Sequence, residues 1–131
     1  MAHFLLKTEP SVYSLQNLKQ AKRTAWDGIA NPVALKHLRS AALGDDAVVY
    51  HTGDERAAVG LAKIVKPAYI DEKSGLMVDV KFVEQFARSV TLGVIKADPL
   101  FADSPLVRQG RLSFVPLTDE QFKRIMELAK A

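Results

Sequence analysis

The chain contains no cysteine among its 131 residues. This absence excludes disulfide bonds, thiolate metal sites and a cysteine nucleophile. Histidine is scarce as well: His3, His37 and His51 are scattered without the spacing of metal ligands, so we expect neither a zinc site nor another cofactor. The sequence also lacks an apolar run near the roughly 20 residues that a membrane-spanning helix needs. With no basic leader or cleavage site ahead of the first apolar run, the pattern favours a cytoplasmic protein without a membrane partner.

Sequence motifs for catalysis are missing too. The chain has no Gly-x-Ser-x-Gly nucleophile elbow and no Walker-type phosphate loop. Its adjacent acidic pairs, Asp45-Asp46 and Asp71-Glu72, lie in turn-like contexts, where solvated turns explain them better than an acid/base pair. We therefore expect a protein that is not an enzyme.

The charge balance is only mildly basic. Eighteen Lys and Arg residues against 15 Asp and Glu give a formal net charge of +3, which permits a nucleic-acid partner without requiring one. With 48% hydrophobic residues, the chain can bury a substantial core, so residues 1–131 are expected to form one domain. We expect this domain to be a monomer.

Capping residues mark three helix starts. One cap precedes a helix over residues 15–21, a second precedes a helix that we expect to end at Gly44, and the third precedes an amphipathic C-terminal helix. The three caps are Ser14, Asn31 with Pro32 behind it, and Thr118 with Gln121 in a capping box.

Apolar and alternating runs predict strands near residues 3–6, 47–51, 58–65, 77–86 and 112–115. Pro67 is expected to interrupt the third strand. Connections between consecutive strands are short, which favours antiparallel neighbours. This order predicts an α+β domain whose sheet curls into a small barrel, because a doubly wound parallel fold needs strands and helices to alternate throughout.

Trp26, the only tryptophan, lies in a polar, glycine-containing segment from Thr24 to Pro32. A core tryptophan usually has apolar neighbours at strand or helix spacing, so we interpret this segment as a loop. On a loop beside Asp27 and Gly28, the indole can offer a bare face to a single base. The alternative is that Trp26 plugs the end of the fold.

A first polar cluster follows the first predicted strand. Glu9 comes directly after Lys7 and Thr8, and side chains at a strand end can converge on a pocket. The alternative is that Glu9 pairs with Lys7 or caps a turn.

A second polar cluster, Tyr50-His51-Thr52, ends an otherwise apolar strand. Strand ends at a barrel mouth are a common place for ligand groups, and His51 can hydrogen-bond a base edge. The alternative is that Tyr50 belongs to the core and His51 caps a strand.

Basic residues flank Trp26 on both sides in the sequence, and a second pair occurs later. They are Lys19, Lys22, Arg23, Lys36 and Arg39, followed by Arg108 and Arg111. Such a stripe can follow a phosphate backbone. The alternative is a solvated helix face.

A set of short motifs resembles the EVE domain family, in the same order and over nearly the whole chain. The motifs are Leu5-Leu6-Lys7-Thr8-Glu9-Pro10 with Tyr13-Ser14, Trp26-Asp27-Gly28-Ile29-x-Asn31, Leu38-Arg39, Gly44-Asp45, Tyr50-His51-Thr52, Val59-Gly60-Leu61-Ala62 and Arg108-Gln109-Gly110-Arg111-Leu112-Ser113. The resemblance implies a PUA-like fold, similar in layout to YTH domains, which hold a methylated adenine in an aromatic cage. It also implies recognition of modified bases in DNA or RNA without enzymatic activity. By this resemblance Trp26 would form the cage wall, with Lys7 and Thr8 at its rim.

The chain departs from the family pattern at three places, of which His3-Phe4, where an aromatic pair is usual, is the mildest. Ala30 stands where the family usually has an arginine before Asn31, and residues 34–36 read Ala-Leu-Lys where Ala-Arg-Asn is frequent. Each lost guanidinium removes a fixed fork of hydrogen-bond donors. The chain also has no second tryptophan, so Tyr50 or another side chain must complete a cage, or the pocket is open on one side.

The leading hypothesis is a module that recognises a modified base in single-stranded or flipped-out nucleic acid. Trp26 would stack on the base, a contact worth about 1–3 kcal/mol. The base edge would be read by Thr8, Asp27, His51 and Thr52, and phosphates would be contacted by Lys7, Lys36 and Arg39. The full candidate site comprises Lys7, Thr8, Glu9, Trp26, Asp27, Gly28, Asn31, Arg39, Tyr50, His51 and Thr52.

Two alternatives belong to other functional classes. One is a small RNA- or nucleotide-processing enzyme that uses Glu9 or His51 as a base. The other is a protein-interaction module in which Trp26 anchors the interface.

Overall fold

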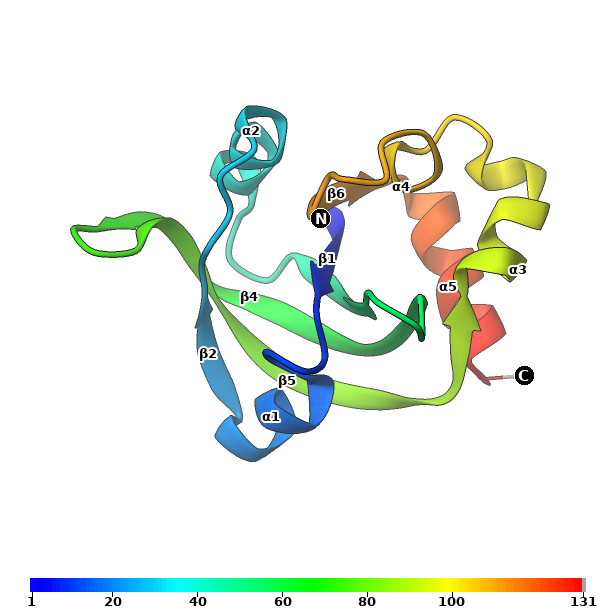
Figure 1. The fold of residues 1–131 in the computed structure, drawn as a ribbon, viewed down its shortest axis with the longest axis horizontal. Coiled ribbons are helices and arrows are strands. Elements are labelled where there is room, and N and C mark those ends of the chain that lie inside the picture. The colour runs from blue at the N-terminus through cyan, green and yellow to red at the C-terminus, as the bar shows by residue number, and fades with distance from the viewer. Residues whose placement is uncertain (131) are drawn as a thin grey trace.

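Within residues 1–130, the part of the chain that the computed structural model describes, six strands form one mixed sheet (Figure 1). The strands are β1 (His3–Thr8), β2 (Arg23–Trp26), β3 (Asp46–His51), β4 (Ala57–Asp71), β5 (Gly75–Thr91) and β6 (Phe114–Leu117). Their order across the sheet is β2-β5-β4-β3-β1-β6. The antiparallel pairing expected for consecutive strands is confirmed for β3 with β4 and for β4 with β5. β1 with β6 and β2 with β5 are antiparallel as well, whereas β1 and β3 run parallel.

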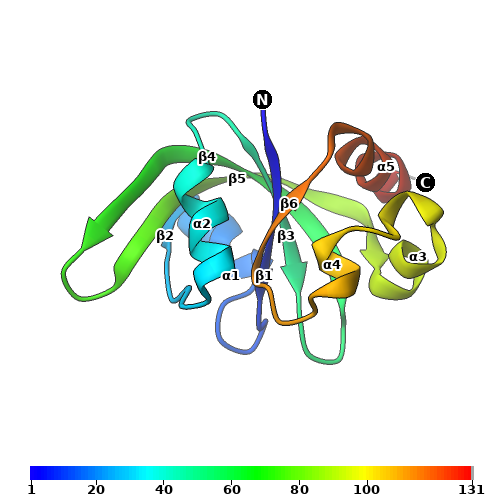
Figure 2. The same ribbon diagram turned by 90° about the horizontal axis from the view of Figure 1, so that it is seen from above.

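The helices gather in two groups. They are α1 (Leu15–Ala21), α2 (Pro32–Ser40), α3 (Leu92–Ala97), α4 (Pro105–Arg108) and α5 (Asp119–Lys130), with a short 3-10 helix η1 at Pro99–Phe101. α1 and α2 lie toward β2, whereas α3, α4 and α5 gather toward the opposite end of the molecule (Figures 1 and 2). None of the helices within residues 1–130 is long and apolar enough to cross a membrane.

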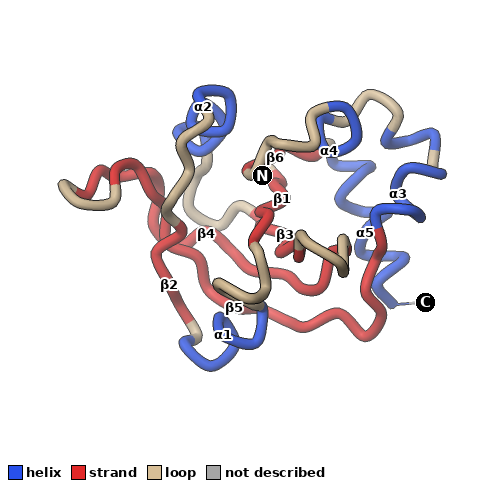
Figure 3. The backbone as a smooth tube through the Cα atoms, viewed as in Figure 1, coloured by secondary structure: helices blue, strands red, loops and turns tan. Residues whose placement is uncertain are grey.

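The sheet of residues 1–130 is not closed into a barrel, because its hydrogen-bonded order ends at β2 and β6. The α+β class expected from the sequence is confirmed, whereas the expected closure is not observed. The long strands β4 and β5 shift register at several points along their pairing, and each shift bends a strand pair. The result is an open, strongly curved sheet (Figure 3).

All three predicted helix caps are present. Ser14 Oγ accepts the backbone N–H of Asn17 at 3.1 Å, and Asn31 Oδ1 accepts that of Val33 at 2.8 Å. At the C-terminal helix, Gln121 N donates to Thr118 Oγ1 at 3.1 Å while Thr118 N donates to Gln121 Oε1 at 3.0 Å. These caps satisfy backbone donors that the first helical turn leaves unpaired, which is why local sequence was enough to find them.

The expected end of the second helix was wrong. α2 ends at Ser40, and Ala41 is already extended. Ala42 N donates to the Asp45 carboxylate at 2.8 Å, so an acidic side chain takes the backbone donor that a longer helix would use. Gly44 instead occupies the turn before β3, where its φ of +89° favours glycine.

Pro67 does not end a strand, contrary to expectation. β4 continues through it to Asp71. The pairing with β5 shifts register on both sides of Lys66, and the next paired residue is Tyr69, so Pro67 lies in an irregular stretch. A proline is tolerated there because no ladder hydrogen bond requires its missing N–H.

The core lies along β1 and β3. Leu5 and Leu6 are fully buried, and every residue of β3 is buried. Phe101, Phe114 and Ile125 close the core from η1, β6 and α5. Because these strands are rigidly packed, the residues at their C-terminal ends are held in fixed positions.

Candidate functional site

A cavity of about 490 Å³, called here the tryptophan cavity, opens where β1 and β2 both end. Its wall comprises Lys7, Thr8, Val12, Tyr13, Thr24, Ala25, Trp26, Asp27 and Gly28. Three other strands separate β1 from β2 in the sheet order, so the curvature of the sheet brings the two strand ends to one cavity. Its volume falls within the roughly 300–1,000 Å³ of small-molecule sites.

Trp26 is not on a loop. It is the last residue of β2, paired with Val78 of β5, and it is only 7% exposed. Its ring packs against that of Tyr13 in a T-shaped pair, with centroids 6.1 Å apart and planes at 88°. The expected bare indole is therefore a buried ring with a limited accessible margin on the cavity.

Lys7 and Thr8 bring polar atoms to the tryptophan cavity from the end of β1. Thr8 Oγ1 donates to the carbonyl of Tyr13 at 2.7 Å, which fixes the loop that follows the strand. Lys7 Nζ donates to the carbonyl of Gly110 at 2.9 Å and lies 5.8 Å from the centroid of the Tyr50 ring. Burial lowers the pKa of Lys7 below its usual range.

A second, smaller cavity of about 210 Å³ borders the first, since Lys7 belongs to the walls of both. Tyr50 and Thr52 line this second cavity, which is called here the basic cavity. Burial raises the pKa of the Tyr50 hydroxyl, and the nearby Arg56 guanidinium opposes that rise. Of the two polar clusters expected at strand ends, Lys7 and Thr8 thus line the tryptophan cavity. Tyr50 and Thr52 line the basic cavity, which Lys7 also borders.

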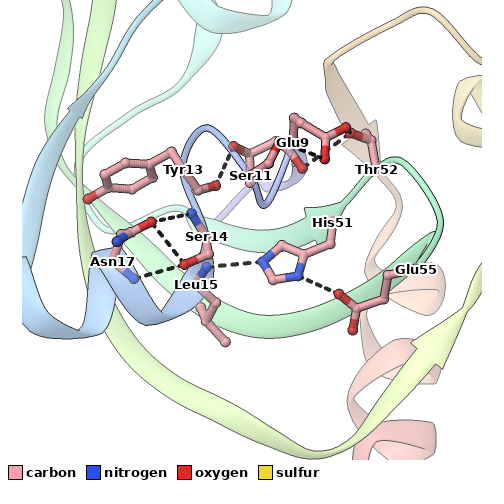
Figure 4. Close-up of polar contacts among 10 residues, drawn as sticks. Glu9, Ser11, Tyr13, Ser14, Leu15, Asn17, His51, Thr52 and Glu55 are labelled. Carbon is pink, nitrogen blue, oxygen red and sulfur yellow. Dashed lines mark hydrogen bonds and ion pairs between the residues drawn. The ribbon is translucent and has the colours of Figure 1, made fainter.

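His51 holds the start of α1 to β3 (Figure 4). Its Nε2 accepts the backbone N–H of Leu15 at 3.0 Å, so the ring proton lies on Nδ1. Nδ1 in turn donates to Glu55 Oε1 at 2.6 Å. With both nitrogens engaged, His51 offers no free atom to a base edge or to acid/base chemistry. His51 therefore has a structural role, as in the alternative interpretation, but it binds the backbone at the start of α1 and does not cap a strand.

Glu9 is exposed and lines neither cavity. Its carboxylate accepts from the hydroxyls of Ser11 and Thr52, both at 3.4 Å (Figure 4). These contacts place Glu9 at the rim of the basic cavity, bonded to hydroxyls and not to Lys7.

The candidate residues of α2 lie away from both cavities. Asn31 uses its side-chain oxygen to cap the helix. Lys36 and Arg39 are exposed on the helix surface and belong to neither cavity wall. The structure therefore brings Lys7, Thr8, Trp26, Asp27 and Gly28 together and leaves Asn31 and Arg39 outside.

Several wall residues were not expected from the sequence. In the tryptophan cavity these are Val12, Tyr13, Thr24 and Ala25, and in the basic cavity they include Arg56 and Lys96. The segment from Arg23 to Trp26 alternates between more exposed and more buried positions in the structure. Its sequence, Arg-Thr-Ala-Trp, has no matching alternation of polar and apolar residues that could have revealed β2. No local pattern marks Arg56 or Lys96, because the fold brings them to Lys7 from distant segments.

Comparison with known protein families matches residues 2–128 to the EVE domain, which confirms the resemblance carried by the motifs. Mouse thymocyte nuclear protein 1 is 36% identical, with 96% of this chain and 73% of that protein covered. The human THYN1 protein, solved in complex with 5-methylcytosine-containing DNA, is 31% identical with a TM-score of 0.90, covering 100% of this chain and 99% of that one. A protein from Rhodopseudomonas palustris is 35% identical with a TM-score of 0.90, covering 98% and 93% of the two chains.

The expected cytoplasmic location is corrected by these comparisons. The human and mouse relatives both carry the name thymocyte nuclear protein 1. That name points to a nuclear rather than a cytoplasmic location for these relatives.

Proposed function

This chain belongs to the EVE domain family, and from that premise we propose that it is a DNA-binding module that reads a modified base without catalysing a reaction. The observation that carries the proposal is the tryptophan cavity, in which an aromatic wall and a few polar groups converge. The human THYN1 complex supports 5-methylcytosine as the first base to test.

A base in duplex DNA must leave its stack to reach such a cavity, at a cost of a few kcal/mol. The margins of the Trp26 and Tyr13 rings form the apolar part of the wall that would receive it. Because most of the Trp26 ring is already covered, we expect the stacking contribution to lie near the lower end of the usual 1–3 kcal/mol per base.

Asp27 and Thr8 supply the polar part of the wall. Asp27 is exposed directly after β2, and a carboxylate can accept a hydrogen bond from the exocyclic amino group of cytosine. The Thr8 hydroxyl proton is engaged by the carbonyl of Tyr13, so Thr8 would act toward a base through its free lone pairs. We propose Asp27 as the principal reader of the base edge.

The methyl group itself adds little to affinity. Burial of one methyl contributes about 0.8 kcal/mol, which corresponds to about a fourfold preference. We expect the module to prefer 5-methylcytosine over cytosine by that modest factor, unless a polar contact also changes.

The same geometry argues against the two alternatives. An enzyme using His51 lacks a free ring nitrogen, since Leu15 and Glu55 engage both. An enzyme using Glu9 needs that carboxylate in a cavity, whereas Glu9 is exposed and lines neither one. An interface anchored on Trp26 needs an exposed ring, whereas this ring is 7% exposed. The proposal includes a single PUA-like domain, supported by the family membership and by a hydrophobic core that runs through the whole sheet. It keeps the expectation that this domain acts as a monomer.

Fluorescence of the only tryptophan provides the test. The protein is titrated with short single-stranded oligonucleotides that contain cytosine or 5-methylcytosine at one position. We expect Asp27→Ala to weaken binding by about tenfold, in line with 1–3 kcal/mol for a base-edge contact. Glu72→Ala is the matched control, because Glu72 is an exposed turn carboxylate outside both cavities. Equal affinities for Asp27→Ala and Glu72→Ala would contradict the proposed reading of the base.

A further inference from the structure

The basic cavity has a cationic wall without a carboxylate. Its lining residues are Lys7, Tyr50, Thr52, Gly53, Arg56, Leu92, Lys96, Leu106, Val107 and Gly110. The three cations come from separate segments: Lys7 from β1, Arg56 from the connection between β3 and β4, and Lys96 from the last turn of α3. The fold thus gathers three positive charges around one small space.

None of these three cations forms an ion pair within residues 1–130. Other basic side chains do so, for example Arg23 with Asp79 at 2.9 Å and Arg124 with Asp98 at 2.6 Å. The Glu9 carboxylate lies beside Gly53 at the cavity rim, where it accepts from the hydroxyls of Ser11 and Thr52. The wall of the cavity therefore carries three cations that no carboxylate of residues 1–130 holds in an ion pair.

The donors of the cavity are only partly used. Lys7 Nζ donates one hydrogen bond, to Gly110 O, and its other two protons remain free. Arg56 Nε donates to Gly53 O at 3.2 Å, which leaves the four outer N–H groups of the guanidinium available. Arg56 also has a φ of +45°, a left-handed conformation that is costly for a non-glycine residue and recurs where a ligand is clamped.

We infer that the basic cavity binds a phosphate group of the DNA strand, next to the base held in the tryptophan cavity. Arg56 would contact the phosphate through its fork of donors, with Lys7 and Lys96 as point charges beside it. This inference rests on the proposed function and names the backbone contacts that accompany it. It moves the phosphate contacts from Lys36 and Arg39 on α2 to Arg56 and Lys96, and it retains Lys7.

The test compares two double variants that remove the same charge. R56Q with K96Q alters the basic cavity, and K36Q with R39Q alters the exposed surface of α2. The ligands are a single-stranded oligonucleotide containing 5-methylcytosine, the 5-methyl-2′-deoxycytidine nucleoside, and inorganic phosphate. Binding of the first two is followed by tryptophan fluorescence at several salt concentrations, and thermal melting checks that each variant is folded.

We expect the basic-cavity variant to bind the oligonucleotide at least about tenfold more weakly at low salt. Its slope of log K against log salt should shrink by about one per lost contact. Its affinity for the nucleoside, which has no phosphate, should be unchanged. The α2 variant should show a smaller loss and a smaller change of slope.

Other outcomes separate this inference from the proposed function. Equal losses for the two double variants would overturn the phosphate assignment while leaving base reading intact. If the wild-type protein binds neither the oligonucleotide nor the nucleoside, the proposed function fails. In that case the amide resonances of Gly53 and Gly110 still report on inorganic phosphate: a shift that R56Q with K96Q abolishes identifies a site for free phosphate and overturns the assignment to a DNA strand.

Discussion

β1 and β3 run side by side in the same direction. The two ends of this strand pair differ in whether their charged side chains have partners of opposite charge. At the starting end, His3 lies between the carboxylates of Asp46 and Asp119, at 2.8 and 2.9 Å, and Lys63 pairs with Asp46 at 3.0 Å. At the finishing end, Lys7 lies between two cavities and has no carboxylate partner within residues 1–130. One end is closed by its own polar contacts, and the other keeps donors free.

The closed end ties the C-terminal helix to the sheet. The His3 ring stacks on Phe122 of α5, with centroids 4.2 Å apart and planes at 9°. Each polar atom of the His3 ring has a partner, which is the arrangement that stabilises a fold. The open end leaves polar groups available instead, so the comparison separates residues that maintain the structure from residues that can bind.

Trp26→Ala is expected to have the largest effect, because it removes a packed ring from the open end. Replacing a buried aromatic residue with alanine usually lowers the free energy of unfolding by about 3–5 kcal/mol, and DNA binding should fall as well. Urea denaturation followed by circular dichroism measures the first quantity, and Trp26→Phe is the control that retains part of the packing. A loss below about 1 kcal/mol would mean that the ring is less firmly packed than its 7% exposure indicates.

His3→Ala should produce the next largest effect, at the closed end. It removes two polar contacts and the stacking on Phe122, and we expect a loss of about 1–3 kcal/mol in stability. DNA affinity should not change, because His3 belongs to neither cavity. His37→Ala on α2 is the control. A weaker affinity for DNA in folded His3→Ala would break the separation between the two ends.

Tyr13→Phe is expected to stabilise the protein slightly. The Tyr13 hydroxyl is the one buried side-chain polar atom in the described part of the chain, residues 1–130, that lacks a hydrogen-bond partner. Removing such a group while keeping the ring should raise the free energy of unfolding by up to about 1 kcal/mol. Thermal melting with and without the oligonucleotide checks this, since a loss of stability only in the bound state would show that the hydroxyl contacts DNA.

Lys7→Met should have the smallest effect on stability, and one that depends on pH. Because burial lowers the pKa of Lys7 in the folded protein, the charged side chain destabilises the fold at neutral pH. This penalty is relieved as the pH rises from the lowered value toward 10.5. Lys7→Met is therefore expected to be slightly more stable than wild type at pH 7, with the difference narrowing toward pH 10, while DNA affinity falls. A difference that widens with pH would contradict this account.

Features set by neighbouring residues could be predicted from the sequence. The caps at Ser14 and Asn31 depend on contacts within three residues. The strand nature of Trp26 depends on pairing with Val78, more than fifty positions along the chain, and the polar residues around Trp26 concealed it. Lys7 and Trp26 were predicted as candidate residues, and both line the tryptophan cavity. Arg56 and Lys96, which line the basic cavity, were not predicted, because only tertiary packing brings them to Lys7.

The side chain shared by the two cavities has a consequence for how tightly any nucleotide is held. Lys7 borders both spaces, so a base in one and a phosphate in the other would be joined by a short covalent tether. Two weak interactions linked in this way act as a bivalent ligand with a high effective concentration. An isolated nucleoside or free phosphate should then bind far more weakly than an intact strand that carries both groups. Only the intact strand would occupy the protein at low concentration.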